Sequence, residues 1–390
     1  MSRFVPWALV ALCFVLGVAS RSISDTFTVF VPALQGDFVA SRSAITLVYS
    51  FALLVGGTGA PIAGWIVDRF GLRVLTMVGV TAVTLASAFA SRATAVWHLY
   101  LCLGIVMGFG GASLSGVLSS TLLGRWFPAN RLGVALAVAW SASGVGAIVM
   151  FPLAEHLIVT QGWRHAFAAA ALVAAVAAAW VWRTVPDGVR PPPMDLSRWA
   201  ATLADRHLMG LVAVTALSGA GQFTLMTYLA PYYRQELGAS PGEASGLFFW
   251  FGLWGVTGAM VMTRAVQRIG ASASVTLALM LMAASPLAWP LAGSVPAMAL
   301  VLLPWGLGCF AANSAQQARL AEAAPASANA LMALNTSAIY VGQGIGAAGG
   351  GAMVAAGGLT SLWPVALAWM GLAVLLSAQL ARPAAGALRR

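Results

Sequence analysis

Charged residues are scarce in this 390-residue chain: Asp, Glu, Lys and Arg make up 8% of it. An ordinary soluble domain holds about 25% charged residues, so a soluble enzyme and a disordered chain are excluded. The apolar stretches are continuous rather than alternating, which excludes a transmembrane β-barrel. A helical membrane protein remains, because one span needs about 20 apolar residues and 60% of this chain is hydrophobic.

Lysine is absent, and all twenty basic residues are arginine. In a membrane protein these arginines orient the spans, so the net charge of +10 predicts no nucleic-acid partner. Cys13, Cys102 and Cys309 lie within apolar stretches, where a thiol behaves as a small hydrophobe. The four histidines are scattered, and no nucleophile lies near a base. We therefore expect no disulfide, no metal, no cofactor and no enzymatic activity.

Twelve apolar segments follow one another along the chain. A Pro- and Asp-containing polar stretch at residues 184–206 separates the first six from the last six. This pattern predicts an all-α membrane protein with a six-helix bundle at 1–183, a cytoplasmic linker at 184–206 and a second bundle at 207–390. The expected segments are 5–34, 44–67, 72–91, 96–123, 132–158, 163–183, 207–234, 243–265, 271–292, 296–320, 328–356 and 361–381.

The arginines predict the orientation. With the N-terminus in the cytoplasm, fifteen arginines fall on the inner side, four fall in outer loops, and Arg21 lies within a span. The start of the chain resembles a signal peptide, but its apolar character resumes after Asp25, so we expect it to be the first helix. We predict a multi-pass protein of the inner (plasma) membrane with both termini in the cytoplasm.

The two halves carry a sequence repeat. Shifted by 199 positions, residues 32–71 align without gaps on residues 231–270, with eleven of the forty positions identical. Gly71 then matches Gly270, and Arg69 matches Arg268. Because the second copy returns six spans later, both halves have the same topology, and the bundles are predicted to be pseudo-symmetric. Such parallel repeats are typical of transporters.

The loop after the second segment contains a charged motif, Gly-x-x-x-Asp-Arg-x-Gly-x-Arg, at residues 64–73. It resembles the signature loop of the major facilitator superfamily, which joins the second and third helices on the cytoplasmic side. Gly71 permits a positive φ, and an aspartate can pair with arginine in one state and release it in another. The resemblance implies a conformational latch made of Gly64, Asp68, Arg69, Gly71 and Arg73, and we expect Arg125 or Arg131 on the next inner loop to be the partner of Asp68.

Two subfamilies share the resemblance. The first half is similar to bacterial monocarboxylate and oxalate/formate carriers, on the stretches 125–128, 144–146, 151–153 and 162–164. The second half is similar to small-metabolite and drug efflux carriers, on residues 227–231, 313–317 and 333–342. The chain also departs from each subfamily: its eighth helix lacks the Asp/Arg pair of monocarboxylate carriers, and residues 143–152 lack the Gly-Pro motif of drug antiporters.

Arg21 and Asp25 are the two ionisable residues placed deep within a predicted span. A charge at mid-bilayer costs at least about 2.5–3.5 kcal/mol and by default marks function. Their i, i+4 spacing places both on one face of the first helix. We expect Arg21 to attract an anionic group of the substrate and Asp25 to hold Arg21 or carry a coupling proton; a self-neutralising structural pair is the alternative.

Uncharged polar and aromatic residues in the spans complete the candidate site. Amides in a span need partners, either on neighbouring helices or on a solute. For the aromatic side chains, packing or a place at the membrane interface is the competing explanation. The glycines from Gly342 to Gly351 are better explained by close helix packing. The further candidates are Tyr49, Trp140, Gln222, Tyr228, Asn313, Gln316, Asn335 and Tyr340.

These observations predict secondary active transport of a small organic solute by alternating access. Proton coupling and an organic anion are the favoured details, and proton-driven efflux of drugs or small metabolites is the alternative. A non-transporting membrane sensor or enzyme is the alternative of another class. The expected partners are the lipid bilayer, the solute and the proton, with the chain acting as a monomer.

Overall fold

The computed structural model describes residues 4–114, 122–123, 126–127, 135, 138–139, 142–185 and 196–381. Within these residues the secondary structure is helical, and each of the twelve predicted segments contains helix. Eight helices of the described part are long and apolar enough to cross a membrane. The all-α membrane fold predicted from composition is thereby confirmed.

The chain forms two compact units, Met1–Pro193 and Met194–Arg390, which we call unit 1 and unit 2. In unit 1, α3 packs along α9, α1 packs against α8 and α9, and α2 packs against α5 and η1. The fourth segment holds a π-helical stretch, η1. The elements of unit 1 are α1 (Phe4–Phe38), α2 (Arg42–Phe70), α3 (Leu72–Ala90), α4 (Val96–Leu99), η1 (Tyr100–Met107), α5 (Gly108–Ser113), α8 (Ala142–Gln161) and α9 (Trp163–Thr184).

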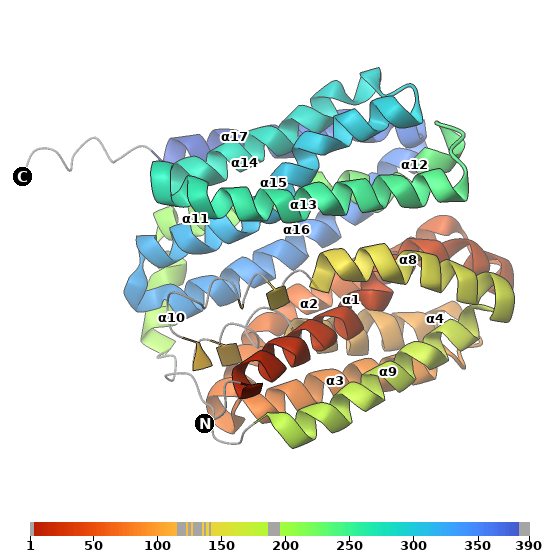
Figure 1. Cartoon of the computed structure of the whole chain (residues 1–390), viewed down its shortest axis with the longest axis horizontal. Helices are drawn as coiled ribbons and strands as arrows, with labels where there is room; N and C mark the ends of the chain where they lie inside the picture. The colour runs from red at the N-terminus through yellow and green to blue at the C-terminus, as the bar shows by residue number, and fades with distance from the viewer. Residues whose placement is uncertain are drawn as a thin grey trace, which may run out of the picture. The chain divides into compact units, whose positions relative to one another are not determined.

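The helices of unit 2 run side by side, coloured green to blue in Figure 1. Here α11 packs against α16 and α17, while α15 packs against α13 and α14. The elements of unit 2 are α10 (Leu196–Ala204), α11 (Arg206–Met226), α12 (Leu229–Gln235), α13 (Pro241–Ile269), α14 (Ala271–Ala288), η2 (Trp289–Leu291), α15 (Val295–Ala323), η3 (Pro325–Ser327), α16 (Ala328–Gly357), η4 (Leu359–Ser361) and α17 (Leu362–Leu380).

The sequence repeat corresponds to a repeat of local structure. Helices α2 and α13 begin and end at positions that are 199 residues apart, and Ser41 and Ser240 each cap the first turn with a side-chain oxygen. Gly71 and Gly270 end these helices with φ of 90° and 80°, and donate their N–H groups to Val67 and Val266. A residue with a Cβ would be strained at both glycines. The same short-range signals therefore start and stop the same helix in each unit.

Two features of unit 2 differ from the predicted elements. The linker expected at 184–206 contains a helix, α10, which packs against α11 and α16. The seventh segment, expected to be continuous, is divided into α11 and α12 at Thr227–Tyr228. The physical reason for the break lies at Pro231, whose ring lacks an N–H and collides with the carbonyl group four residues earlier. That carbonyl belongs to Thr227.

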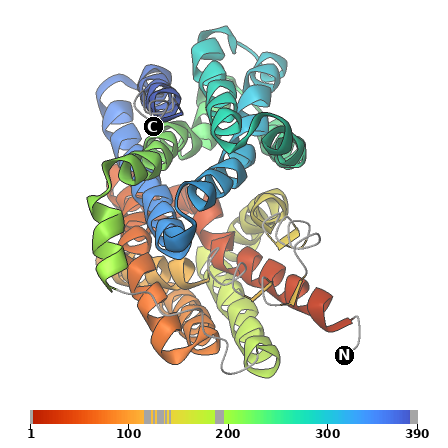
Figure 2. The same cartoon turned by 90° about the vertical axis from the view of Figure 1, so that its left-hand side faces the viewer.

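Small residues set the spacing between α11 and α16, two helices of unit 2 that Figure 2 shows from a second direction. A Cβ built on Gly342 would collide with the carbonyl oxygen of Ala216, and one on Gly346 would collide with that of Ala220. Close backbone approach of this kind drives helix association where both helices are already in lipid. Gly342 and Gly346 are therefore packing residues, as the sequence predicts.

A serine of α14 hydrogen-bonds to the backbone of α15 beside a proline. The Ser285 hydroxyl, on α14, donates to the Val301 carbonyl oxygen at 2.6 Å and accepts from the Trp305 N–H at 3.1 Å. In a regular helix these two backbone groups pair with each other. Pro304 lies between them, and proline in a membrane helix is tolerated where neighbouring hydroxyls satisfy the backbone.

A buried arginine joins three helices at the other end of α15. Arg319 is 3% exposed, and its guanidinium donates to the side-chain and backbone oxygens of Ser377 at 3.0 and 3.2 Å. The Ser377 hydroxyl also bonds with Thr276 at 2.8 Å. We counted Arg319 among the inner arginines; it lies within α15 because this helix continues to Ala323.

An exposed ion pair ties α1 to α9 in unit 1. Arg164 Nη1 lies 2.6 Å from Asp37 Oδ2, and the Trp163 indole donates to the same oxygen at 2.9 Å. The hydrogen bond from Trp163, and then the one from Arg164, lower the pKa of the Asp37 carboxyl below its ordinary value. Asp37 lies beyond the span predicted at 5–34.

Replacing Ser285 with alanine should destabilise the protein by about 1–3 kcal/mol, because a buried backbone donor and acceptor lose their shared partner. Thermal unfolding of the purified chain in detergent measures the loss. Ser314→Ala is the matched control, since the Ser314 hydroxyl bonds only to carbonyl oxygens of its own helix. Equal melting temperatures for the two variants would rule out the bridging role.

The Asp37 pair should stabilise the fold above pH 3.8, the ordinary carboxyl pKa, and lose this contribution as the pH falls through the lowered folded-state pKa. The pair is half-exposed, so Asp37→Asn should cost at most about 1 kcal/mol at pH 7. The gap between wild type and Asp37→Asn should close in acid. Glu322→Gln, which alters an exposed carboxylate, should show no such gap; a gap that widens in acid would refute the assignment.

Candidate functional site

The charged loop of unit 1 joins α2 to α3. Gly71 adopts the positive φ that the motif predicts. Arg73 reaches the end of α9, where its Nη2 donates to the Trp182 carbonyl oxygen at 2.6 Å. Its guanidinium also lies 4.5 Å from the centroid of the Trp182 ring, within range of a cation–π interaction. The motif thus links the start of α3 to the end of α9.

Other members of the proposed latch are less closely held or lie outside the described residues. Arg69 is exposed and lies 6.0 Å from the Trp65 ring and 5.8 Å from the Phe70 ring. Gly64 and Asp68 lie in α2, but the structure does not describe their side chains. Arg125 and Arg131 are outside the described residues, so the pairing of Asp68 stays a prediction.

The backbone of α1 carries Arg21 and Asp25, whose side chains lie outside the described part of the chain. Their roles stay predictions. Tyr49, on α2, is buried and stacks on Phe27 of α1, with ring centroids 5.8 Å apart and planes at 12°. Trp140 is outside the described residues. Tyr49 therefore packs against α1 through its ring.

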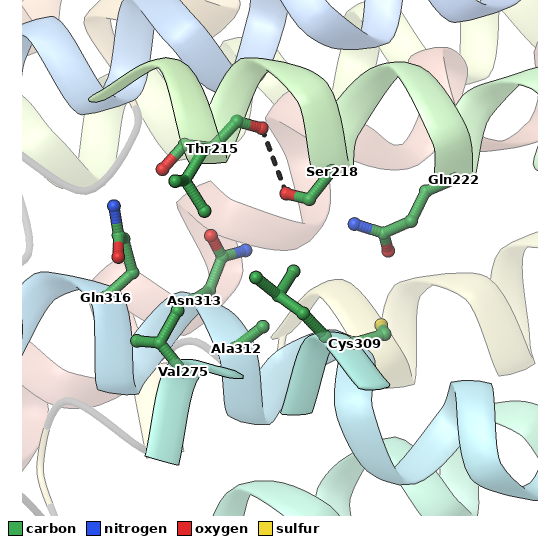
Figure 3. Close-up of a pocket in the computed structure, with 10 residues that line it drawn as sticks. Thr215, Ser218, Gln222, Val275, Cys309, Ala312, Asn313 and Gln316 are labelled. Atoms are coloured by element: carbon green, nitrogen blue, oxygen red, sulfur yellow. Dashed lines mark hydrogen bonds between the residues drawn. The ribbon is translucent and has the colours of Figure 1, made fainter. Parts of the chain in front are cut away.

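A pocket in unit 2 brings together three of the predicted site residues, Gln222, Asn313 and Gln316 (Figure 3). They come from α11 and α15, and α14 supplies an apolar wall. The cavity has a volume of about 20 Å³, room for about one water molecule. The lining consists of Val214, Thr215, Ser218, Gln222, Val275, Leu279, Cys309, Ala312, Asn313 and Gln316.

Side-chain hydrogen bonds surround this pocket, both between α11 and α15 and within α11. Gln316 Nε2 donates to the Leu211 carbonyl oxygen at 2.6 Å, joining α15 to α11. Trp305 Nε1 lies 3.4 Å from Gln222 Oε1, at the long end of hydrogen bonding. Ser218 donates to the Thr215 carbonyl oxygen at 3.0 Å. Polar side chains at membrane depth are thus partly, but not fully, satisfied by the protein.

The remaining predicted residues of unit 2 lie outside this lining. Asn335, on α16, is 1% exposed and accepts a hydrogen bond from the Thr215 hydroxyl at 2.7 Å. Tyr228 is buried and donates to the Ala347 carbonyl oxygen at 3.2 Å. Tyr340 is half-buried on α16. Asn335 therefore holds the lining residue Thr215 in place, and Tyr228 links the start of α12 to α16.

Two polar lining residues, Thr215 and Ser218, were not among the site residues predicted from the sequence. Thr215 and Ser218 precede Gln222 on α11 by about two turns and one turn, so all three fall on one face of the helix. A scan of i, i+3/i+4 spacing back from Gln222 would have found both. Aside from the Cys309 thiol, the lining contains no ionisable side chain, and no group of three or more metal-ligating side chains occurs among the described residues. The chemistry offered here is neutral hydrogen bonding.

Comparison with known proteins gives relatives of several kinds. Human monocarboxylate transporter 11 is 28% identical over 232 residues, covering 58% of this chain and 49% of that protein. The transcription regulatory protein OpdE of Pseudomonas aeruginosa is 30% identical over 290 residues, covering 73% and 71%. The purine ribonucleoside efflux pump NepI of Salmonella paratyphi B is 29% identical over 245 residues, covering 62% and 59%.

The chain thus spans about half the length of the human relative and less than two thirds of NepI. The family model of the Major Facilitator Superfamily matches residues 10–347, which include the charged loop and all the pocket-lining residues. The resemblance inferred from that loop and the twelve-segment pattern is confirmed. This chain belongs to the Major Facilitator Superfamily.

Proposed function

We propose that the chain is a secondary active transporter that moves a small organic solute across the inner (plasma) membrane by alternating access. The observation that carries this proposal is the pocket of unit 2, where polar side chains of α11 and α15 line a space within membrane-spanning helices. Burying an amide in lipid costs free energy unless the amide has a hydrogen-bond partner. We therefore assign the unpaired amide groups of this pocket to binding a ligand. The protein works as a monomer and needs no cofactor.

The solute is an organic anion and the coupling ion is a proton. Arg21 and Asp25, one turn apart on α1, supply the charges that support this assignment. Arg21 binds the anionic group, while Asp25 balances Arg21 or carries the proton. The similarity to human monocarboxylate transporter 11 supports this assignment. The Asp68 carboxylate, paired with Arg125 or Arg131, stabilises the outward-open state.

Two other candidate functions have specific support. Export of an uncharged metabolite is favoured by the uncharged lining of the unit 2 pocket and by the name of the NepI relative. A non-transporting sensor is favoured by the regulatory name of OpdE, which aligns over 73% of this chain. Flux through purified protein in liposomes separates the sensor from both transporters, and the charge of the solute separates the transporters.

Variants of the first helix test the anion assignment. Arg21→Gln should abolish uptake of an anionic solute, and Arg21→Lys should restore it poorly, because an ammonium cannot form the bidentate fork. Asp25→Asn should keep exchange but lose accumulation driven by a pH gradient. The measurement is uptake of labelled lactate into proteoliposomes with and without that gradient.

Arg92→Gln is the matched control, since Arg92 is an exposed arginine in the loop between α3 and α4. It should transport like wild type. If Arg21→Gln and Asp25→Asn also transport like wild type, the pair is structural and the anion assignment falls. Flux of an uncharged solute alone, unaffected by these variants, would favour the exporter.

A further inference from the structure

Gln316 lines the unit 2 pocket and carries an unpaired hydrogen-bond acceptor. The residue is 3% exposed, and its amide nitrogen is held by the Leu211 carbonyl oxygen at 2.6 Å. Its Oε1 is shielded from solvent and has no hydrogen-bond partner among the described residues. A buried acceptor left unpaired costs about 1–3 kcal/mol. Of the described side chains with such an atom, Gln316 is the one that also lines the pocket.

Two further amides face the same space. Figure 3 shows Gln222 extending from α11 and Asn313 from α15 toward the space between these helices. Gln222 Oε1 has the long contact from Trp305, and the Gln222 nitrogen makes no hydrogen bond with the described residues. The Asn313 amide likewise makes none within the described part. The pocket therefore offers both donors and acceptors to a ligand.

The fixed direction of the Gln316 amide decides what the pocket selects. Because its nitrogen is occupied by Leu211, the group left for a ligand is the oxygen, which only accepts. Gln222 and Asn313 can each donate or accept and can adapt to the rest of the ligand. With no ionised group in the lining, a buried charge would lack compensation here. The pocket thus suits an uncharged hydrogen-bond-donating group of the solute.

We infer that the unit 2 pocket selects solutes bearing a hydroxyl or N–H group, which donates to Gln316 Oε1 while the Asn313 and Gln222 amides bind neighbouring polar atoms. The inference rests on the proposed transport function and deepens it, since it names a required group of the solute. A hydroxyl on an organic anion and an N–H on an uncharged heterocycle both satisfy this requirement. Gln316 is then the specificity-determining residue of α15.

Matched solute pairs test the inference. Lactate and propionate differ by one hydroxyl, and 9-methyladenine and N6,N6,9-trimethyladenine differ by the N–H donors of one amino group. The purified full chain in detergent is titrated with each compound, and its thermal unfolding gives an apparent Kd. In at least one pair, the donor-bearing member should bind tenfold or more tightly, which corresponds to about 1.4 kcal/mol. The pair that responds shows which chemistry the solute has.

Two methionine variants locate the effect. Gln316→Met keeps the length of the side chain and removes the acceptor, so the two members of the responding pair should bind equally. Gln317→Met is the matched control, because Gln317 is the next residue on α15 and does not line the pocket; it should keep the preference.

Three outcomes would overturn the inference: equal binding within every pair by wild type, an unchanged preference in Gln316→Met, or binding of no compound at millimolar concentration. Uptake of the same four compounds into proteoliposomes separates this failure from failure of the proposed function. Uptake without any preference for the donor leaves transport standing and removes the role of Gln316. Absence of uptake for all four counts against transport itself.

Discussion

The hydrocarbon core of a bilayer offers no hydrogen-bond partner, so a polar group at that depth must be satisfied by protein or by a ligand. Much of unit 2 follows from this constraint. Ser285 supplies the partner for two backbone groups next to Pro304, and Ser377 holds the buried guanidinium of Arg319. Asn335 accepts from Thr215, which would otherwise carry an unpaired hydroxyl. These hydrogen bonds join neighbouring helices and fix their positions relative to one another within unit 2.

The same constraint applies to the polar groups of the pocket that lack hydrogen-bond partners in the protein. The acceptor oxygen of Gln316 and the amides of Asn313 and Gln222 gather in one space between α11, α14 and α15. Each of these groups costs free energy when it is buried without a hydrogen-bond partner. A solute that supplies the missing donor or acceptor removes this cost. In unit 1 the Arg73–Trp182 and Asp37–Arg164 contacts lie at helix ends instead.

Local signals in the sequence predict much of this fold. The spacing of Ser41 and Gly71 sets the length of α2, and the equivalent spacing of Ser240 and Gly270 sets that of α13. Amides within apolar segments also pointed to Gln222, Asn313 and Gln316. The sequence did not separate them from Asn335 and Tyr228, because helix rotation decides whether a side chain faces a pocket or a neighbour. The role of Ser285 could not be predicted for a similar reason, since its hydroxyl bonds to the backbone of another helix, α15.

The central claim is that this membrane-embedded chain moves a solute without a chemical energy source of its own. Counterflow measures this most directly. Proteoliposomes containing the purified full chain are loaded with unlabelled lactate or adenosine, and the same compound is added outside as a trace of label, with no nucleotide present. The account predicts that label for at least one compound accumulates transiently inside above its external concentration. Entry no faster than into protein-free liposomes, for both compounds, would contradict it.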